Sequence, residues 1–217
     1  MNSINVIGRG RVGTALAARL EDRGVELRED AELFLVCVPD RAIAEIAGSI
    51  EPGPWVAHVS GATPLAALDP HERRFSVHPL QTFTLSRGPE QLDGAFAAVT
   101  GETEEALASG RWLAETLGLR PFELDDGART LYHAGAAIAS NYLVTLYRAA
   151  SRLFEDAGAP PEGLVPLMTR TIENGFELTG PISRGDWAVV EAHLAALHEG
   201  RPELEPMYRV LAEATSA

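Results

Sequence analysis

The chain has 217 residues and a formal net charge of −13, and its 46% of hydrophobic and 23% of charged residues are ordinary for a soluble globular protein. The negative charge excludes proteins that bind nucleic acid through a basic surface, and no apolar run approaches the ~20 residues of a membrane span. All 18 basic residues are arginine, which excludes Schiff-base chemistry and a P-loop lysine. We expect no nucleic-acid or membrane partner and, since the first residues have a strand pattern rather than that of a signal peptide, a cytoplasmic location.

The first 124 residues alternate between short apolar runs and stretches of helix-forming residues. Leu33–Val38 is apolar without alternation, which is typical of a parallel strand buried on both faces. Pro39 ends this run, and Asp40 is in position to cap the next helix. The alternation predicts an α/β domain over residues 1–124. The predicted strands are Ile4–Gly8, Leu33–Val38, Val56–Val59, Phe75–His78, Ala95–Thr100 and an edge strand Pro121–Leu124, and the predicted helices are Thr14–Arg23, Arg41–Ser49 and Glu104–Leu117.

Residues 125–217 show a different pattern. Ala128–Asp156 contains no proline and a single glycine, and its apolar residues recur at three- and four-residue steps, which predicts one long helix. Three shorter helices are predicted at Leu164–Glu173, Asp186–Glu199 and Glu203–Ala214. The chain is therefore predicted to have two domains, an α/β domain at 1–124 and an all-helical domain at 125–217.

The turn G-R-G-R-V-G, between the first strand and the first helix, has a phosphate-binding pattern. Gly8 permits the tight turn, Gly10 lets a pyrophosphate approach the backbone, and Gly13 lets the helix pack on the strand. The helix N-terminus adds free N–H groups, and the two arginines of the turn add positive charge. A glycine-rich turn kept only for packing is the alternative. We predict a Rossmann-type site for NADP or NAD that consists of Gly8, Arg9, Gly10, Arg11, Val12, Gly13, Val38 and Pro39.

The region after this first strand–helix unit is shorter than such a fold requires. A dinucleotide-binding fold places an acidic residue on the ribose about 20 residues after the turn. Here residues 25–29 can form the second strand, with Glu29 or Asp30 as the acid, or with Arg28 facing a 2′-phosphate. Glu32 already opens the next strand, whereas a parallel crossover needs about a dozen residues. We therefore predict a mostly parallel Rossmann-type sheet that lacks one strand–helix unit.

Six stretches carry a resemblance that covers nearly the full chain. They are V-I-G-R-G-R-V-G, V-C-V-P-D (36–40), H-V-S-G-A (58–62), V-H-P-L-Q-T-F (77–83), Y-H-A-G-A-A-I-A-S-N (132–141) and L-T-G-P-I-S-R-G-D (178–186). The chain resembles Rossmann-like proteins whose helical second domain is catalogued only as a domain of unknown function. These are relatives of pyrroline-5-carboxylate reductase, prephenate dehydrogenase, ketopantoate reductase and the deazaflavin-dependent NADP reductases. The resemblance implies an oxidoreductase-type fold, a substrate cleft between the domains and a dimer through the helices.

Histidine is the candidate proton donor, because hydride transfer to a carbonyl or imine needs a donor and this chain has no lysine. His133 lies in the first turns of the long helix, where small residues let a ligand or another backbone come close. Ser140 follows on nearly the same face, whereas Asn141 is turned aside by about 80°. His78 ends a strand, at the edge where open sheets bind ligands. We take His78, His133 and Asn141 as candidate catalytic residues, with helix packing and backbone hydrogen bonding as the alternative roles.

Ser60 and Arg184 are the candidate substrate-binding residues. Ser60 follows another strand end, although it can equally tie its own loop. Ser183 and Asp186 fit a capping box, which leaves Arg184 in a glycine-framed loop that suits a carboxylate. No Cys, His or carboxylate cluster has the spacing of metal ligands, so no metal is expected.

These features predict an NAD(P)-dependent reductase or dehydrogenase that acts on a small anionic keto or imino acid. The alternative is a non-catalytic sensor or scaffold that keeps the fold and has a degenerate cofactor site. Apolar positions along the long helix, such as Leu131, Ile138, Leu146 and Leu153, exceed what three short helices can cover. They predict a homodimer through the C-terminal helices.

Overall fold

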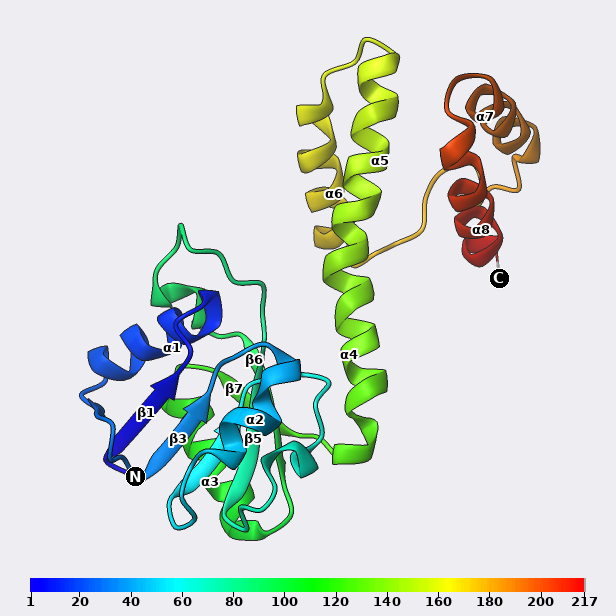
Figure 1. Cartoon of the computed structure of the whole chain (residues 1–217). Helices are drawn as coiled ribbons and strands as arrows, with labels where there is room; N and C mark the ends of the chain where they lie inside the picture. Colours follow the sequence, from blue (N-terminus) through cyan, green and yellow to red (C-terminus); the bar gives the residue numbers. More distant parts are fainter. Residues whose placement is uncertain (217) are drawn as a thin grey trace. The chain divides into compact units, whose positions relative to one another are not determined.

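The computed structural model describes residues 1–216, which form a seven-stranded sheet with flanking helices, followed by further helices (Figure 1). The strands are β1 (Ser3–Ile7), β2 (Glu26–Leu27), β3 (Leu33–Val36), β4 (Trp55–His58), β5 (Arg74–Leu80), β6 (Phe96–Gly101) and β7 (Arg120–Glu123). The helices are α1 (Arg11–Asp22), α2 (Ile43–Gly48), α3 (Glu104–Thr116), α4 (Arg129–Ala137), α5 (Leu143–Asp156), α6 (Leu164–Glu173), α7 (Trp187–Gly200) and α8 (Glu205–Ser216). The predicted fold class, a mostly parallel α/β sheet followed by helices, is confirmed.

The strand order is β2-β1-β3-β4-β5-β6-β7, and the first five strands in this order are parallel. β6 runs antiparallel to β5 and parallel to the edge strand β7. The register pairs Ile7 with Val36 and Val36 with His58, so the carboxyl ends of β1, β3 and β4 meet at one edge. This edge is where open α/β sheets bind ligands, beside the strand at which the order reverses.

The sheet lacks the strand–helix unit whose absence the sequence predicts. β2 is only two residues long, pairs with β1 as an outer strand, and is followed by β3 after residues 28–32. So short a connection contains no helix, and β3 lies on the other side of β1. The chain therefore changes direction across the sheet at β1, with little structure beyond β2.

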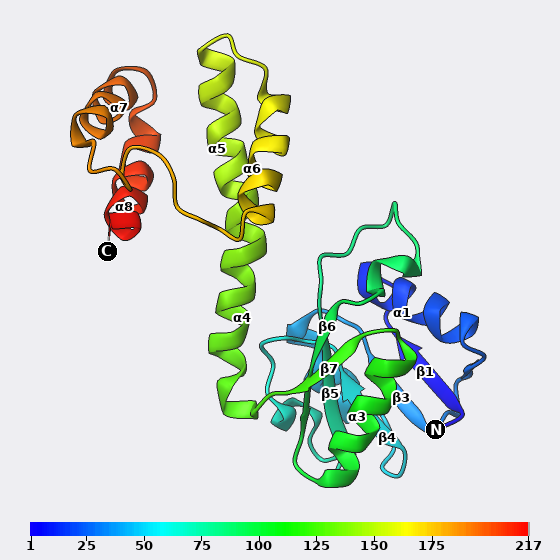
Figure 2. The same ribbon diagram turned by 180° about the vertical axis from the view of Figure 1, so that it is seen from behind.

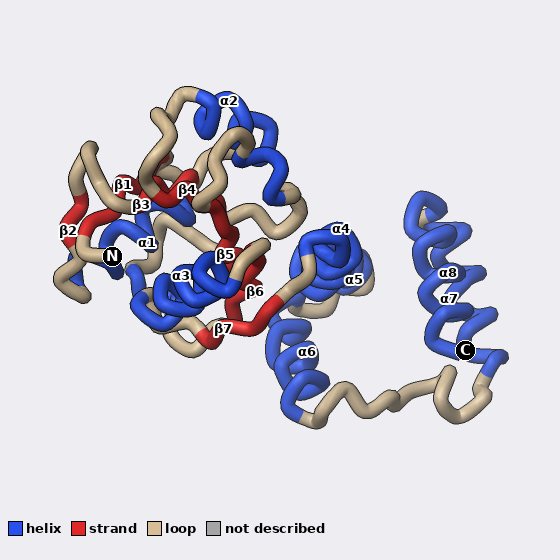
Figure 3. Tube along the Cα trace, turned by 90° about the horizontal axis from the view of Figure 1, so that it is seen from below, coloured by secondary structure: helices blue, strands red, loops and turns tan. Residues whose placement is uncertain are grey.

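Helices cover both faces of the sheet. α1 and α3 lie on one face and α2 lies on the other, as the views from behind and from below show (Figures 2 and 3). Each fully buried leucine in these layers stabilises the fold by roughly 1.5–3 kcal/mol. The larger core includes Leu16 and Leu20 of α1, Leu113 and Ala114 of α3, and Ile4, Leu33, Leu35, Phe75 and Val77 of the strands, and the smaller core includes Ile43 and Ala47 of α2 with Val36, Val56, Leu65 and Leu68.

Several boundaries and caps differ from the prediction. α1 begins at Arg11 rather than Thr14, because Gly10 has an extended backbone and acts as the N-cap without a side chain. Asp40 makes no capping hydrogen bond, since it lies inside a short 3-10 turn before α2. The expected capping box is also wrong: the Ser183 hydroxyl donates to the Gly180 carbonyl, and Asp186 is the N-cap of α7 without a side-chain bond.

The long helix predicted at 128–156 is present, with one irregularity. α4 and α5 are joined by a π-helical segment, Ile138–Tyr142, so the helical run continues from Arg129 to Asp156 with one wide turn. A π turn holds one more residue than an α turn, and such turns occur frequently at functional sites. Periodicity cannot reveal the wide turn, because the apolar pattern continues across it.

By compactness the described chain divides into two units, Met1–Asn141 and Tyr142–Ala217. This division falls within the π segment, whereas the sequence pattern changes after residue 124. The assignment of residues 125–217 as a separate dimerisation and substrate domain stays a prediction. Among residues 1–216, no helix is long and apolar enough to cross a membrane.

The start of α1 packs very closely on the turn before it. A Cβ added to Gly13 would lie 1.9 Å from the Gly8 carbonyl oxygen and 3.0 Å from the Cβ of Cys37. Gly8 itself has a φ of +99°, and a Cβ there would lie 2.4 Å from the Cys37 carbonyl oxygen. The glycine turn is thus pressed against the end of β3.

We predict that Gly13→Ala destabilises the fold, because the added methyl group meets backbone that cannot move without shifting α1. The expected loss in the free energy of unfolding is about 1–3 kcal/mol. Gly10→Ala, three residues earlier in the same turn, is the control, since a Cβ at Gly10 meets nothing within 4 Å. Urea unfolding followed by tryptophan fluorescence measures both variants, and equal midpoints for the two would contradict the predicted clash.

Candidate functional site

The carboxyl ends of the parallel strands bring four turns to one edge of the sheet. They are the glycine turn after β1, residues 37–39 after β3, the loop after β4 and the segment after β5. The backbone N–H of Cys37 donates to the Ile7 carbonyl at 2.7 Å, which continues the ladder between β1 and β3 into these turns. The turns are therefore held together by the sheet itself.

The glycine turn has the geometry of a phosphate cradle. Gly10 is exposed and has free space in front of its Cα, since an added Cβ would meet nothing within 4 Å. No side chain caps the N-terminus of α1, so its first N–H groups are open to an anion. The side chains of Arg9 and Arg11 are exposed on either side of Gly10. An open N-terminus, a backbone without a Cβ and two cations together suit a pyrophosphate.

The other predicted cofactor residues have mixed surroundings. Val12 packs against the larger core and Val38 against the smaller one, so both support the turn more than they face solvent. Pro39 is exposed at the end of β3. These positions agree with a phosphate-binding turn that packs on apolar residues, and the contact of Val12, Val38 and Pro39 with a cofactor stays a prediction.

The residues predicted for the ribose form their own ion pairs. Arg28 lies 3.1 Å from Asp30 and 3.7 Å from Glu26, and all three side chains are exposed. The Glu29 carbonyl accepts a hydrogen bond from the Asn5 side chain at 3.1 Å. Neither Arg28 nor Asp30 therefore presents an uncompensated charge at this edge.

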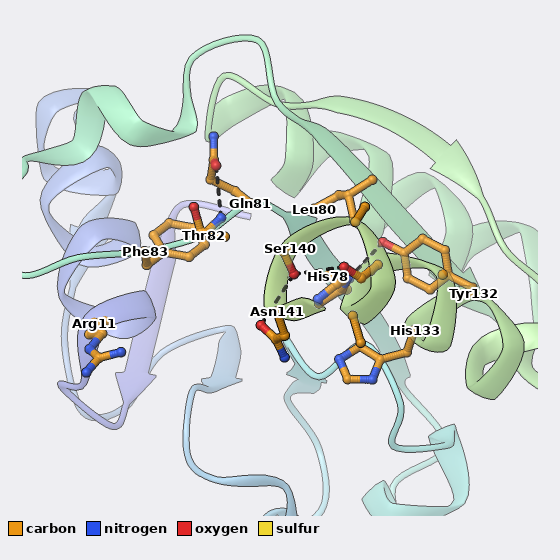
Figure 4. Close-up of a pocket in the computed structure, with 14 residues that line it drawn as sticks. Arg11, His78, Leu80, Gln81, Thr82, Phe83, Tyr132, His133, Ser140 and Asn141 are labelled. Atoms are coloured by element: carbon orange, nitrogen blue, oxygen red, sulfur yellow. Dashed lines mark hydrogen bonds between the residues drawn. The ribbon is translucent and has the colours of Figure 1, made fainter. Parts of the chain in front are cut away.

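A pocket of about 830 Å³ lies in the unit Met1–Asn141, from the start of α1 to the π segment (Figure 4). The segment after β5 forms one wall of the pocket, and α4 with the π segment forms the other. Beyond Tyr132 and His133, the residues of α4 that line the pocket are glycine and alanine, whose small side chains leave room in it. The lining residues are Arg11, His78, Leu80, Gln81, Thr82, Phe83, Tyr132, His133, Gly135, Ala136, Ala137, Ala139, Ser140 and Asn141.

The structure brings four of the predicted residues into this pocket: His78, His133, Asn141 and Arg11. Ser60 does not line it; its hydroxyl donates to Thr63 at 2.9 Å and accepts the Thr63 N–H at 3.0 Å, which ties its own loop. Arg184 is exposed in a turn of the other unit. The substrate-binding roles of Ser60 and Arg184 stay predictions, and only Ser60 has an evident structural role.

Two imidazoles and one phenol meet at the floor of the pocket. The Tyr132 hydroxyl lies 2.8 Å from Nδ1 of His78, and the two rings meet edge to face at 5.5 Å. The His133 ring stands at 75° to the His78 ring, with centroids 6.0 Å apart. Tyr132 and His133 come from the same turn of α4, so this one turn supplies both neighbours of His78.

Burial keeps His78 neutral. Desolvation, aided by the nearby charges of His133 and Arg129, lowers the pKa of His78 to about 4. Asp40 acts in the opposite direction but does not offset the burial. At neutral pH, His78 is therefore an uncharged imidazole, with one nitrogen that donates and one that accepts hydrogen bonds.

Arg129 is a functional candidate that sequence reasoning missed. It is the first residue of α4 and is 1% exposed. Its guanidinium donates to the Ser60 carbonyl and, at 2.8 Å, to the Thr100 hydroxyl, and it lies 3.8 Å from Asp126. An arginine is usually exposed, so the sequence gives no signal that this one is buried. Arg129 joins α4 to the loop after β4 and to β6.

The π segment explains why both Ser140 and Asn141 line the pocket. On a regular α-helix Asn141 would be turned about 80° away from the His133 face. The wide turn contains an extra residue and so turns Asn141 back toward the pocket. The Ser140 hydroxyl donates at 2.8 Å to the carbonyl of Ala136, which lies in the last turn of α4.

Gln91 positions the segment that forms the opposite wall. Its buried amide donates to the carbonyls of Thr84, Arg87 and Gly88, and its oxygen accepts the Thr84 N–H at 2.8 Å. The backbone carbonyl of Gln91 in turn accepts the side chain of Gln81 at 3.0 Å. This network fixes the loop whose start carries Thr82 and Phe83 into the pocket. Among residues 1–216 no group of three or more His, Cys, Asp or Glu side chains could hold a metal ion.

Comparison with known proteins gives a family and a fold. The domain of unknown function DUF2520 matches residues 95–215. No protein among the curated ones matches the chain. Among solved structures, BF3122 from Bacteroides fragilis, provisionally described as an NADP oxidoreductase, is 24% identical with a TM-score of 0.82 and coverage of 99% of this chain and 98% of its own.

Two further structures have the same fold. Protein TM1727 from Thermotoga maritima is 24% identical with a TM-score of 0.76, over 99% of this chain and 90% of its own. The reductive aminase from Aspergillus terreus, in complex with NADPH and ethyl-5-oxohexanoate, is 17% identical with a TM-score of 0.68, over 99% and 93%. At these identities the comparisons establish the Rossmann-like fold of the chain.

We predict that Gly61→Ala disturbs the histidine pair, because Gly61 lies against both rings. A Cβ there would lie 2.7 Å from Cδ2 of His133 and 2.9 Å from Nε2 of His78, so the imidazoles must move. The expected loss in the free energy of unfolding is about 1–3 kcal/mol, with changed NMR signals of His78 and His133.

Gly48→Ala is the matched control, since Gly48 ends α2 and an added Cβ meets nothing within 4 Å. Denaturant unfolding and histidine NMR spectra measure both variants. Unchanged signals of His78 and His133 in Gly61→Ala would show that the loop after β4 does not confine the rings.

Proposed function

Because this chain belongs to the DUF2520 family and has a Rossmann-like fold, we propose that it is an NAD(P)-dependent reductase or dehydrogenase acting on a small keto or imino acid. One observation carries the proposal: Arg11, the first residue of α1, lines the same pocket as His78 and His133, and no side chain caps the N-terminus of that helix. A dinucleotide with its pyrophosphate at α1 would direct its other end toward these histidines. The NADPH complex of the reductive aminase supports the same cofactor class.

The residues present fit the cofactor. Gly10 leaves room for a pyrophosphate, and the helix N-terminus with Arg9 and Arg11 supplies N–H groups and positive charge. When bound, the nicotinamide supplies or accepts the hydride. The compensated charges of Arg28 and Asp30 favour neither NAD nor NADP. We therefore propose NADP or NAD.

The two histidines are proposed to have different roles toward the substrate. His78 is neutral at pH 7, so it serves as a hydrogen-bond donor or acceptor rather than as an imidazolium acid. His133 is the candidate that gives or takes the proton at the substrate carbonyl or imine. Asn141 and Ser140 add polar groups on the same wall, and the small residues of α4 leave room for the substrate. Arg184 stays our proposal for holding a carboxylate.

A homodimer through the C-terminal helices is part of this proposal. Large apolar side chains along the long helix are exposed in the single chain, among them Leu131 at 79% and Ile138 at 61%. On α6, Leu167 is 59% exposed and Val165 54%. Exposed apolar surface of this extent is typical of an interface, and a stable dimer buries about 800 Å² on each partner.

We predict that the wild-type protein binds NADPH or NADH and that Gly10→Val loses this binding. A valine side chain occupies the space of the pyrophosphate, while the extended backbone of Gly10 accepts it without strain (φ −72°, ψ −168°). The expected loss in affinity is at least about 100-fold, or about 2.7 kcal/mol. Fluorescence titration of the reduced cofactors measures it.

The control is Gly48→Val on α2, which should bind like the wild type. If the wild type binds neither cofactor at millimolar concentration, the enzyme proposal fails and the non-catalytic sensor or scaffold takes its place.

We predict a dimer in sedimentation velocity, and a monomer for the double variant Leu131→Glu with Ile138→Glu. Two carboxylates in an apolar interface would be desolvated without partners, which breaks the association. Leu85→Glu is the control, because Leu85 is 72% exposed on a loop outside the C-terminal helices. A wild-type mass that stays monomeric at every concentration contradicts the dimer.

A further inference from the structure

Tyr132 is the residue in closest polar contact with His78. Its hydroxyl lies 2.8 Å from Nδ1, and its ring also packs against Phe122 at 5.9 Å. The two nitrogens of an imidazole lie on opposite sides of the ring, so the contact leaves Nε2 directed away from Tyr132. Nε2 lies on the side of the ring next to Gly61, where an added Cβ would be 2.9 Å away, and the His78 side chain is one of those that line the pocket (Figure 4).

The direction of this hydrogen bond decides where the proton of His78 lies. A neutral imidazole has one N–H and one bare nitrogen, whereas a tyrosine hydroxyl can donate once and also accept. Within residues 1–216 the Tyr132 hydroxyl has a single hydrogen-bond partner, Nδ1 of His78. A phenol O–H is a stronger hydrogen-bond donor than the N–H of a neutral imidazole, and a bare imidazole nitrogen is a stronger acceptor than a phenolic oxygen. The favoured arrangement has Tyr132 donating to Nδ1.

We propose that Tyr132 is a positioning residue that fixes His78 as the Nε2–H tautomer, so that His78 presents a hydrogen-bond donor to the pocket. The acceptor is the carbonyl oxygen or imine nitrogen of the substrate. This role rests on the proposed function, whereas the tautomer itself does not. A fixed donor aimed at an atom that gains negative charge during hydride addition stabilises the transition state.

The charges around His78 agree with a neutral donor. His133 and Arg129 on α4 disfavour protonation of His78, and Asp40 after β3 favours it. His78 in turn disfavours protonation of His58 on β4. Burial decides the balance and lowers the pKa of His78 to about 4, while burial raises the pKa of Tyr132 to about 12. Between these values both groups are uncharged, so the hydrogen bond joins a neutral phenol and a neutral imidazole.

A purely structural role for Tyr132 is the competing explanation. Its ring continues a row of edge-to-face contacts from Phe122 to His78, and packing alone could account for it. Tyr132→Phe separates the two explanations, because it keeps the ring and removes only the hydroxyl. A packing role predicts no change in the proton position on His78.

The chain provides a matched control in the His193–Tyr208 pair. The Tyr208 hydroxyl lies 2.7 Å from Nδ1 of His193, and the two rings meet edge to face at 5.8 Å. This pair joins α7 and α8 and lies in the other unit. Tyr208→Phe therefore removes the same kind of contact from a histidine outside the pocket.

The test is ¹⁵N NMR of the full-length protein with labelled histidine, titrated from pH 4 to 8, with the His78 signals identified by their loss in His78→Gln. The wild type should show His78 as the Nε2–H tautomer above pH 5. In Tyr132→Phe the neutral form loses its hydrogen bond, so the two tautomers should mix and the pKa of His78 should rise by about 0.5–1. Tyr208→Phe should change His193 and leave His78 as in the wild type.

An Nδ1–H tautomer in the wild type overturns the proposal, as does an unchanged tautomer and pKa of His78 in Tyr132→Phe. These NMR measurements need no cofactor or substrate, so a failure of the tautomer proposal can be distinguished from a failure of the proposed function. Once turnover is measured, Tyr132→Phe should lower kcat about 10-fold with a smaller change in KM, and Tyr208→Phe should leave both unchanged. A kcat equal to the wild type contradicts the role of Nε2–H in the reaction.

Discussion

The guanidinium of Arg129 holds the first turn of α4 against the sheet, and the arrangement of the pocket depends on this contact. It reaches the Ser60 carbonyl in the loop after β4 and the Thr100 hydroxyl on β6, two positions far from it in sequence. A cation at the N-terminus of a helix is opposed by the helix dipole, and a buried one also loses its hydration. Asp126, 3.8 Å away, offsets part of this cost and also accepts the backbone N–H of Leu65. The contact fixes the position of the first turn of α4, and thereby the positions of Tyr132 and His133 relative to His78.

The same buried charge shapes the electrostatics of the floor. Arg129 disfavours protonation of both His58 and His78, and burial lowers the pKa of His58 to about 3. His58 accepts the Ser60 N–H on Nδ1 at 3.2 Å, so it also helps to hold the loop after β4. The buried positive charge of Arg129 and the neutral imidazole of His78 at the floor of the pocket suit a substrate atom that becomes more negative as it reacts. Arg129 thus contributes both to the placement of α4 and to keeping His58 and His78 uncharged.

Much of the architecture follows from local patterns in the sequence. The apolar run at 33–38 and the two residues between the predicted strand 25–29 and Glu32 predict a parallel sheet with a missing unit, and the structure has both features. The long helix is equally evident, because its apolar spacing continues for many turns. The helix α1 begins earlier than predicted, since Gly10 ends the strand side of the turn and needs no side chain to start a helix. Local patterns therefore define the elements and leave their ends uncertain by a few residues.

The floor of the pocket was less accessible to prediction, because it is made by contacts between distant segments. His78 meets Tyr132 across 54 residues of sequence, and Arg129 meets Ser60 across 69. The residue types at His78 and His133 indicated chemistry, whereas a tyrosine and an arginine in a helix have many ordinary roles. Gly61 lies in one of the stretches that carry the family resemblance, but only the folded chain shows the two imidazoles against its Cα.

The π segment has a consequence for how this chain tolerates insertions and deletions. A regular α-helix with the same number of residues would turn Asn141 about 80° away from His133, whereas removing one residue before Asn141 would leave it seven residues after His133 and nearly in line with it. Within a single chain most side chains of the segment are exposed, so substitutions there change little of the chain's own packing. A homologue with one residue fewer here and a regular helix would therefore present its counterpart of Asn141 on the same face, and homologues are better compared by the helix face of that side chain than by the number of residues in the turn.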